Sequence, residues 1–295
     1  MGLAKGSVSI LLNECARKTF SGEALTLGKL DIYTSKETLE EVADRFGVAL
    51  TTSAITLASK PEFASLGYIS DESLFSSLGF TTLRSMDYSD FEGADVIHDL
   101  NSENAPIEHR ERYDLIVDAG TLEHVFHFPN ALNNVFQMLK VGGRVVHILP
   151  ASNMVDHGFY MFSPTVLLDY YGANNFTVEY IRLIKHTLDQ KKPWILYDYT
   201  VGCLDNISLG GLDSGMYSVA CVATKKSNST GSVIPQQRCY NEGAWLGLPQ
   251  YLDKGANENS PATGLPGWVK KKINRLKLSL RKKIKGVRMS PYAKY

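Results

Sequence analysis

The chain has 295 residues, of which 44% are hydrophobic and 10% are aromatic. This composition excludes a disordered protein, and the length is sufficient for a full α/β core. No run of eighteen apolar residues occurs, which argues against a membrane-spanning helix, and Asn13, Glu14 and Arg17 interrupt the N-terminal apolar stretch too early for a signal peptide.

The formal net charge of zero conceals an asymmetry. Residues 1–269 carry 20 Lys and Arg against 31 Asp and Glu, whereas residues 270–295 carry 11 Lys and Arg and no acid. The four cysteines are scattered and form no C-x-x-C pair. This spacing favours reduced, structural thiols in a cytoplasmic protein over a disulfide or a metal site.

The first hundred residues alternate between helical and extended patterns. Ser35 is a candidate N-cap with Thr38 at the third helical position, and Gly47 closes that helix. The patterns predict helices at residues 8–18, 35–47 and 71–79, and strands at residues 23–32 (breaking at Gly28), 81–87 and 94–100.

The clearest pattern spans residues 112–150. Residues 113–117 are typical of a buried strand, residues from Pro129 onward show helical periodicity, and residues 144–149 are typical of a second strand. We expect Val141-Gly142-Gly143 to cap the helix between them. The two strands then form a parallel βαβ unit, whose ligands bind at the carboxyl ends of the strands, at Asp118–His124 and from Pro150 onward.

The remaining sequence predicts a helix at residues 164–171, capped by Ser163, and strands at 176–184, 194–201 and 216–224. We expect the last two strands to form an antiparallel hairpin or an edge of the sheet. The interpretation as domains is a body at residues 1–225, a Ser-, Gly- and Asn-rich linker at 226–266, and a basic amphipathic helix or tail at 267–295.

Two acids follow strands in the first half of the predicted sheet. Asp87 stands where a carboxylate accepts hydrogen bonds from the hydroxyls of a ribose, and Asp99 stands where one can accept from an adenine amino group. The alternative is that each acid caps a strand or forms a turn. The chain lacks a G-x-G-x-x-G loop, which argues against NAD or ATP and favours a nucleoside without a diphosphate.

Three segments carry a resemblance to a known family: DLIVDAGTLEHV (114–125), MLKVGGRVVHILP (138–150) and HGFYMFSP (157–164). Over residues 20–225 the chain resembles class I S-adenosylmethionine-dependent methyltransferases. Together with EGADVIHDLN (92–101), the segments are also similar to a narrower group of uncharacterised bacterial methyltransferase-like proteins. The resemblance implies an α/β, Rossmann-like, doubly wound sheet of seven mainly parallel strands with an antiparallel edge strand.

The same resemblance implies S-adenosyl-L-methionine as the cofactor. The glycine-rich signature of the family's first strand has no full counterpart here, so Gly28 and Gly67 are alternative remnants, of which Gly28 follows the better strand. The predicted cofactor-binding residues are Gly28, Asp87, Asp99, Leu100, Asp118, Gly120 and Glu123.

The loops after the fourth and fifth predicted strands supply the candidates for chemistry. His124, His157 and Tyr160 are the candidate catalytic residues, and Asn153, His157 and Tyr160 are the candidate acceptor-binding residues. The alternatives are a histidine satisfied by backbone at a helix start and a loop whose polar side chains fix its own backbone. His109, His127, His147 and His186 show no ligand spacing, so no metal site is expected.

The sequence therefore predicts methyl transfer to an oxygen or nitrogen of a small-molecule or glycan acceptor, for example in cell-surface polysaccharide biosynthesis. The rival interpretation is a catalytically inactive methyltransferase fold that serves as a binding or scaffold protein. The basic segment 268–288 suggests an anionic membrane surface as a partner, hence a peripheral location at the inner membrane face, or an accessory helix packed on the acidic body. Nucleic acid is disfavoured because the body is acidic, and the sequence makes no prediction of oligomeric state.

Overall fold

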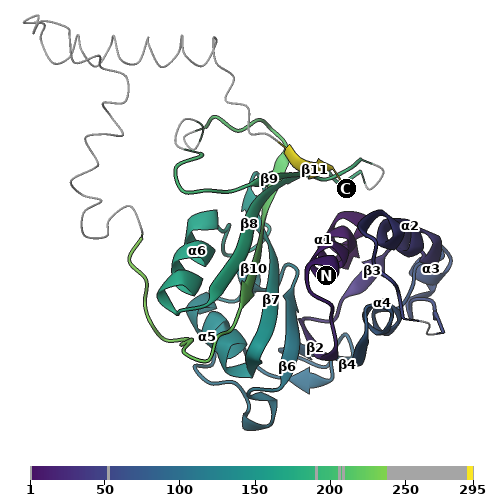
Figure 1. Ribbon diagram of the computed structural model, residues 1–295, viewed down its shortest axis with the longest axis horizontal. Helices are drawn as coiled ribbons and strands as arrows, with labels where there is room; N and C mark the ends of the chain where they lie inside the picture. Colours follow the sequence, from purple (N-terminus) through teal and green to yellow (C-terminus); the bar gives the residue numbers. More distant parts are fainter. Residues whose placement is uncertain are drawn as a thin grey trace, which may run out of the picture. The chain divides into compact units, whose positions relative to one another are not determined.

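The computed structural model describes residues 2–51, 54–189, 192–204, 207, 210–237 and 291–294 (Figure 1). Met1–Thr200, Ser214–Pro235 and Pro291–Tyr295 form one compact unit, which contains every element described below. Among the described residues, none of the helices has the length and apolar character needed to cross a membrane.

The unit is built on a nine-stranded sheet in the order β11-β9-β8-β10-β7-β6-β2-β4-β5. Strands β2, β4, β5, β6 and β7 are parallel, and β10 runs antiparallel between β7 and β8. The bounds are β2 Gly22–Leu27, β4 Phe80–Asp87, β5 Val96–Ile97, β6 Tyr113–Asp118, β7 Leu139–Ser152, β8 Thr177–His186, β9 Ile195–Asp198, β10 Met216–Thr224 and β11 Pro291–Lys294. The α/β class and the doubly wound, mainly parallel sheet are confirmed, but the sheet has nine strands rather than seven.

The predicted strand at residues 23–32 is in fact two strands that belong to different sheets. Its first part is β2, which lies between β6 and β4 in the large sheet, and its second part is β3 (Asp31–Tyr33), which pairs in parallel with β1 (Gly2–Ala4). Gly28, with φ of 80°, lies at the point where the chain leaves the large sheet.

The helices largely follow the predicted pattern. Ser35 Oγ accepts a hydrogen bond from the backbone N–H of Thr38, and Gly47 ends that helix with φ of 66°, as predicted. The bounds are α1 Lys5–Arg17, α2 Lys36–Phe46, α3 Pro61–Ala64, α4 Asp71–Ser77, α5 Phe128–Met138, α6 Pro164–Ala173, and the 3₁₀ turns η1 Ile107–His109 and η2 Leu122–His124.

Helices cover both faces of the sheet, with α1, α2 and α4 on one side and α5 and α6 on the other (Figure 1). Alternation along the strands directs side chains to the two cores. In β6, Leu115 and Val117 pack in the core beneath α1, α2 and α4, and Ile116 packs in the core beneath α5 and α6. In β7, Val146 packs in the former core and Val145 in the latter. Each face of the sheet is therefore buried.

The same alternation places a buried ion pair beneath α1. Arg144 of β7 points to this face, and its Nη1 lies 2.7 Å from Oε1 of Glu14, with both side chains 5% exposed or less. Arg144 Nη2 also donates to the carbonyl of Lys18 at 2.8 Å, so this one side chain fixes the end of α1 to the sheet.

The predicted helix cap at Val141-Gly142-Gly143 is wrong. Helix α5 ends at Met138, and the two glycines lie within β7, where Gly142 has φ of 84°. A Cβ at Gly143 would come within 2.8 Å of the carbonyl oxygen of Tyr113, so glycine permits close strand pairing there. The carbonyls of Phe136 and Leu139 at the helix end accept hydrogen bonds from Nζ of Lys225, at 2.9 and 2.7 Å.

Two further predictions about strands are corrected. The hairpin expected from residues 194–201 and 216–224 does not form, because β9 pairs with β8 whereas β10 inserts between β7 and β8. Residues 217–223 of β10 are buried without interruption, a pattern that requires a central strand covered on both faces. The strand expected at 94–100 is reduced to Val96–Ile97.

The first part of the predicted linker packs on the unit. Tyr170 Oη donates to the carbonyl of Gly231 at 2.8 Å, and Asn174 Nδ2 donates to the carbonyl of Val233 at 2.9 Å, so this segment lies along α6. The rest of the linker from residue 238 and the predicted basic helix at 268–288 lie outside the described residues.

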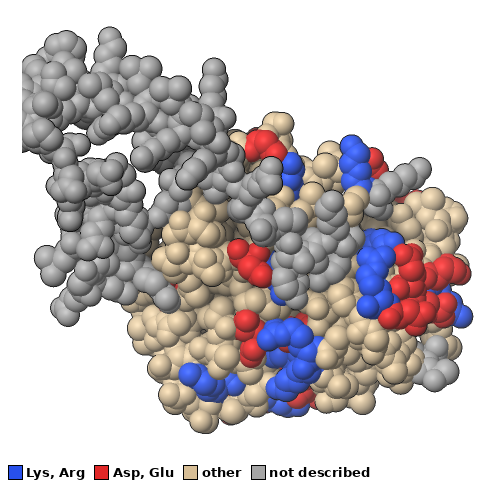
Figure 2. All heavy atoms as spheres, turned by 45° about the horizontal axis from the view of Figure 1, so that its top comes forward, with Lys and Arg blue, Asp and Glu red and all other residues tan. Residues whose placement is uncertain are grey.

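The described surface mixes charges of both signs. On the face drawn in Figure 2, basic and acidic side chains lie next to one another in groups separated by uncharged surface. Ion pairs such as those of Glu41 with Lys5 and Arg45 produce such mixing.

Candidate functional site

The candidate site lies where the order of the strands in the sheet reverses. From β2 the chain proceeds to β4 and β5 on one side, and then returns to place β6 on the other side of β2. Leu27 is in register with Met86 of β4 and with Asp118 of β6, so these three strands end at the same level. In open parallel sheets, the crevice at such a reversal is where ligands bind.

Gly28 lies directly beside Asp87 at this edge. The backbone N–H of Gly28 donates to the carbonyl of Met86 at 2.6 Å, and Thr121 Oγ1 donates to the carbonyl of Leu27 at 2.6 Å, which ties together the ends of the three strands. Gly67, by contrast, follows α3 in a turn. The preference for Gly28 as the glycine after the central strand is therefore borne out by the topology, while its contact with a cofactor stays a prediction.

Hydrogen bonds from nearby backbone amides reach both predicted nucleoside-binding acids. Asp87 is half-buried and its Oδ1 accepts from the N–H of Tyr88 at 2.6 Å. Asp99 Oδ1 accepts from the backbone and side-chain nitrogens of Asn101 at 2.9 and 2.8 Å, and these bonds lower the pKa of Asp99. Leu100 is buried in the core beside α5 rather than facing the edge. Asp99 thus fits the alternative of a turn former.

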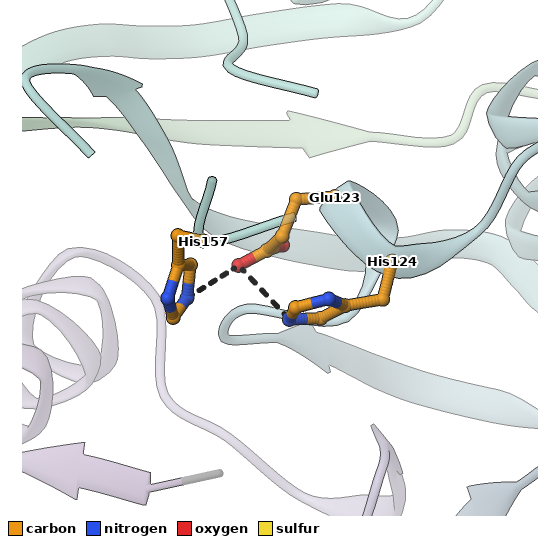
Figure 3. Close-up of side chains that lie close together, drawn as sticks. All are labelled: Glu123, His124 and His157. Carbon is orange, nitrogen blue, oxygen red and sulfur yellow. Dashed lines mark ion pairs between the residues drawn. The ribbon is translucent and has the colours of Figure 1, made fainter. Parts of the chain in front are cut away.

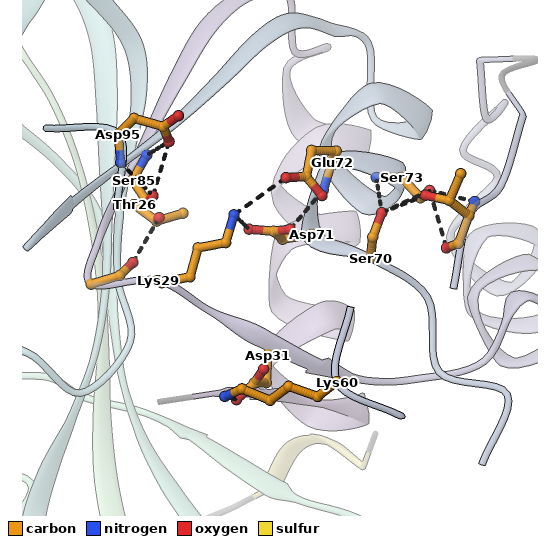
Figure 4. Close-up of polar contacts among 12 residues, drawn as sticks. Thr26, Lys29, Asp31, Lys60, Ser70, Asp71, Glu72, Ser73, Ser85 and Asp95 are labelled. Atoms are coloured by element: carbon orange, nitrogen blue, oxygen red, sulfur yellow. Dashed lines mark hydrogen bonds and ion pairs between the residues drawn. The ribbon is translucent and has the colours of Figure 1, made fainter. Parts of the chain in front are cut away.

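An ion-pair cluster fixes the loop that follows Gly28 (Figure 4). Lys29 Nζ lies 2.9 Å from Oδ2 of Asp71 and 3.2 Å from Oε1 of Glu72, both in the first turn of α4. Burial raises the pKa of Asp71 to about 6, whereas the hydrogen bond with Asp71 lowers the pKa of Glu72 to about 2. The loop after β2 is therefore held by charge.

A buried chain of three polar side chains lies beneath the edge. Asp118 Oδ2 is 2.7 Å from Nδ1 of His147, and Nε2 of His147 is 2.6 Å from Oη of Tyr171. All three residues are fully buried. Asp118 Oδ1 accepts from the N–H of Thr121 at 3.0 Å and more weakly from that of Leu122 at 3.4 Å. Asp118 therefore supports the turn η2 from below and is not free to contact a ligand.

The turn η2 presents Glu123 and His124, which meet His157 from the loop after β7 (Figure 3). Nε2 of His157 lies 3.6 Å and Nε2 of His124 4.0 Å from Oε1 of Glu123. The Glu123 side chain is 1% exposed, whereas the two imidazoles are about half exposed, at 46% and 50%. Burial, with a smaller contribution from Asp118, raises the pKa of Glu123 to about 8, and burial lowers the pKa of His124.

Unusual backbone in the loop after β7 brings His157 to this position. Asn153 and Asp156 have φ of 60° and 67°, a left-handed conformation that non-glycine residues adopt infrequently. The N–H of Tyr160 donates to the carbonyl of Glu123 at 3.3 Å. A Cβ at Gly158 would come within 2.8 Å of that carbonyl oxygen and 2.9 Å of Cγ of Glu123. The absence of a side chain at Gly158 is what allows the loop to approach Glu123.

Asn153 and Tyr160, which were also predicted to bind the acceptor, form hydrogen bonds that fix the loop after β7. Tyr160 Oη donates to the carbonyl of Phe126 at 2.8 Å, and Asn153 Nδ2 donates to the carbonyl of Gly215 at 2.7 Å. Of the candidate catalytic residues, the structure thus brings His124 and His157 together with Glu123. The contacts of Tyr160 and Asn153 are those of the alternative, in which polar side chains fix the loop itself.

Exposed apolar side chains flank the Glu123–His124–His157 group. Phe126 is 59% exposed and Phe159 67% exposed, and their rings contact edge to face at 5.8 Å between centroids. Val155, in the same loop as Phe159, is also strongly exposed. Apolar surface beside a polar group is typical of a binding site for an organic molecule.

Sequence reasoning missed the role of His147. It named Glu123, His124 and His157 separately but did not predict that they converge. Asp118 and His147 are cross-strand partners in β6 and β7, so aligning these two strands would have indicated their contact. The approach of His157 to Glu123 depends on positive φ at Asn153 and Asp156. Neither position is a glycine, so the sequence does not mark this backbone conformation.

Comparison with family models and with curated protein sequences finds no match. Among solved structures, the chain is similar to a Burkholderia thailandensis 1,6-didemethyltoxoflavin N1-methyltransferase with bound S-adenosylhomocysteine (15% identity, 75% of this chain and 78% of that chain, TM-score 0.37). It is also similar to loganic acid methyltransferase with S-adenosylhomocysteine (10%, 76% and 94%, 0.40). A third is an S-adenosylmethionine-dependent methyltransferase from Thermotoga maritima (14%, 74% and 89%, 0.35).

Proposed function

We propose that the protein transfers a methyl group from S-adenosylmethionine to an oxygen or nitrogen of a small-molecule or glycan acceptor. One observation carries the proposal. The ends of three parallel strands place Gly28, Asp87 and Gly120 at the reversal point of the sheet, next to the loops that bear Glu123, His124 and His157. This arrangement supports a nucleoside site and a proton-accepting site that adjoin at one edge of the sheet.

The cofactor side of this edge suits a nucleoside. Asp87 offers a carboxylate to the two ribose hydroxyls, and Gly28 and Gly120, with φ of 80° and 98°, carry no side chain that would block the approach of the ligand to the backbone. Lys29 is occupied by Asp71 and Glu72, so it is not available to neutralise a diphosphate. This arrangement supports S-adenosylmethionine over a dinucleotide.

The acceptor side supplies the chemistry that methyl transfer needs. The acceptor's lone pair attacks the methyl carbon, the carbon–sulfur bond breaks with both electrons going to sulfur, and the acceptor proton leaves to a base. His124 and His157 are half exposed and lie beside Phe126 and Phe159, so an acceptor resting on these rings can present its hydroxyl or amine to an imidazole.

Cofactor binding tests the proposal directly. In isothermal titration calorimetry, S-adenosylmethionine and S-adenosylhomocysteine are expected to bind, and Asp87→Ala is expected to weaken binding roughly 10- to 100-fold by removing two charge-assisted hydrogen bonds. Asp90→Ala, in the same exposed loop, is the matched control. Absence of heat with both ligands at millimolar concentration, on folded protein, would support the inactive-scaffold interpretation instead.

The basic segment supports a peripheral location for the enzyme, with an acceptor near an anionic membrane. Its charge predicts about 1 kcal/mol of attraction per Lys or Arg near such a surface. Replacing Lys270, Lys271, Lys272 and Arg275 by Gln should reduce flotation with phosphatidylserine vesicles and leave flotation with neutral vesicles unchanged. These substitutions are preferable to truncation because β11, at Pro291–Lys294, pairs with β9. Equal flotation of the two proteins would exclude this location.

A further inference from the structure

The Glu123–His124–His157 group has the composition of a metal site rather than of a hydrogen-bonded triad. One carboxylate oxygen and two imidazole nitrogens lie within 4.8 Å of one another, and both Nε2 atoms face the same oxygen, Oε1 of Glu123 (Figure 3). At 3.6 and 4.0 Å, neither imidazole is close enough to form a hydrogen bond with that oxygen. The three groups converge without satisfying one another.

A second observation concerns the other carboxylate oxygen. The Glu123 side chain is only 1% exposed, and its Oε2 has no hydrogen-bond partner. A buried carboxylate without partners is costly, and burial of charge is usually matched by a pair or by a metal ion. A divalent cation on Oε1 would displace the carboxyl proton and place positive charge beside this buried group.

We infer that Glu123, His124 and His157 bind one divalent transition-metal ion, of the zinc class, at the acceptor side of the site. Bonds of about 2.0–2.2 Å in a tetrahedral arrangement place ligand atoms roughly 3.3–3.5 Å apart. The measured oxygen–nitrogen separations of 3.6 and 4.0 Å reach that spacing through small side-chain rotations. Two nitrogen ligands and one oxygen ligand suit zinc, cobalt, iron or nickel and do not suit magnesium or calcium, which prefer oxygen.

The surroundings define the open position. Glu123 is buried and the two imidazoles are half exposed, so the remaining position lies on the exposed side of the imidazoles, in loops that also carry the exposed rings of Phe126 and Phe159. Three protein ligands with one open position are the arrangement of catalytic zinc sites. In the metal-bound form both Nε2 atoms are ligands and no longer accept the acceptor's proton. A hydroxyl bound at the open position would instead lose its proton more readily, and that proton would pass to solvent. This role, unlike metal binding itself, rests on the proposed methyl transfer.

The loop geometry supports the same inference. Left-handed backbone at Asn153 and Asp156 costs free energy, and such strain persists where the surrounding structure uses it. Here its result is to place Nε2 of His157 opposite the buried carboxylate. Gly158 contributes by permitting the contact between the loop and Glu123.

Direct metal titration tests the inference without any acceptor. The full chain is treated with a chelator, dialysed and titrated with Co²⁺, whose visible absorption reports its ligands, and separately with Zn²⁺ and Mg²⁺ by calorimetry. We expect one Co²⁺ or Zn²⁺ per chain and no measurable Mg²⁺ binding. His157→Ala, His124→Ala and Glu123→Gln should each weaken binding at least tenfold, with thermal melts to confirm that the variants are folded.

His127→Ala is the matched control, because His127 is an exposed histidine near the site that is not a member of the group. Its affinity for Co²⁺ should equal that of the unchanged protein. Binding that survives His157→Ala, or that is lost in His127→Ala, would overturn the site, and so would tight binding of Mg²⁺. Loss of S-adenosylmethionine binding with intact metal binding would overturn the proposed function alone.

Discussion

Replacing Asp118 by alanine is expected to lower the free energy of unfolding by about 3–5 kcal/mol, the cost of removing one partner from a buried charged or charge-assisted pair. The substitution leaves Nδ1 of His147 without its partner at 2.7 Å in a fully buried place. It also removes the acceptor for the N–H groups of Thr121 and Leu122. These two residues stand at the start of the turn η2, which bears Glu123 and His124. Chemical denaturation followed by circular dichroism measures the loss.

Tyr171→Phe is the graded comparison for that substitution. It removes only the hydroxyl that lies 2.6 Å from Nε2 of His147 and leaves the ring packed, so the expected loss is about 1–2 kcal/mol. If Asp118→Ala costs no more than Tyr171→Phe, the carboxylate does not support the turn in the way described here. Asp118→Asn should fall between the two, because it keeps an acceptor for Thr121.

Replacing Gly158 by valine is expected to reduce methyl transfer about a hundredfold while leaving the sheet folded. An added Cβ would meet the carbonyl oxygen of Glu123 at 2.8 Å and Cγ of the same residue at 2.9 Å, so the loop must move away and carry His157 with it. A displacement of about 1 Å in a reacting group can cost a factor of 10² in rate. Transfer of radiolabelled methyl to an acceptor found by screening measures the effect.

Two further variants serve as a graded comparison and a control for Gly158→Val. Gly158→Ala should give a smaller loss in the same direction, because alanine adds the Cβ without the branches. Gly93→Ala controls for adding a side chain to a loop glycine away from the site: an added Cβ there meets open space, and the φ of 76° at Gly93 makes it the more demanding of the two positions for the backbone. Activity that persists in Gly158→Val, with Gly93→Ala also active, would remove His157 from the reaction.

The parts of the fold that were predictable depend on contacts that are local in sequence. The caps at Ser35 and Ser163 each follow from residues a few positions apart, and both form as predicted. The β6–α5–β7 unit also forms, but α5 ends at Met138 and not at the predicted glycine cap. The position of β10 was not predictable in this way, because its pairing with β7 and β8 joins residues that are about thirty to eighty positions apart in the sequence.

In the candidate site, too, local features were predictable and contacts between distant segments were not. Gly28 and Asp87 were identified because strand ends are marked by glycine and acid in the sequence, and their neighbours in the sheet follow from strand order. Asp118 was also identified, but its role was not, because its partner His147 comes from the adjacent strand. The convergence of Glu123, His124 and His157 depends on backbone angles that the sequence does not specify.

The inner position of β10 has a consequence for synthesis of the chain. Pairing with β10 joins β8 and β9 to the rest of the large sheet, yet residues 216–224 leave the ribosome after every other strand of the described residues except β11. Until they emerge, β7 and β8 have open edges able to pair with other chains. A nascent chain stopped before residue 216 should therefore aggregate or be degraded, while arrest beyond residue 235 should leave the central sheet complete except for β11.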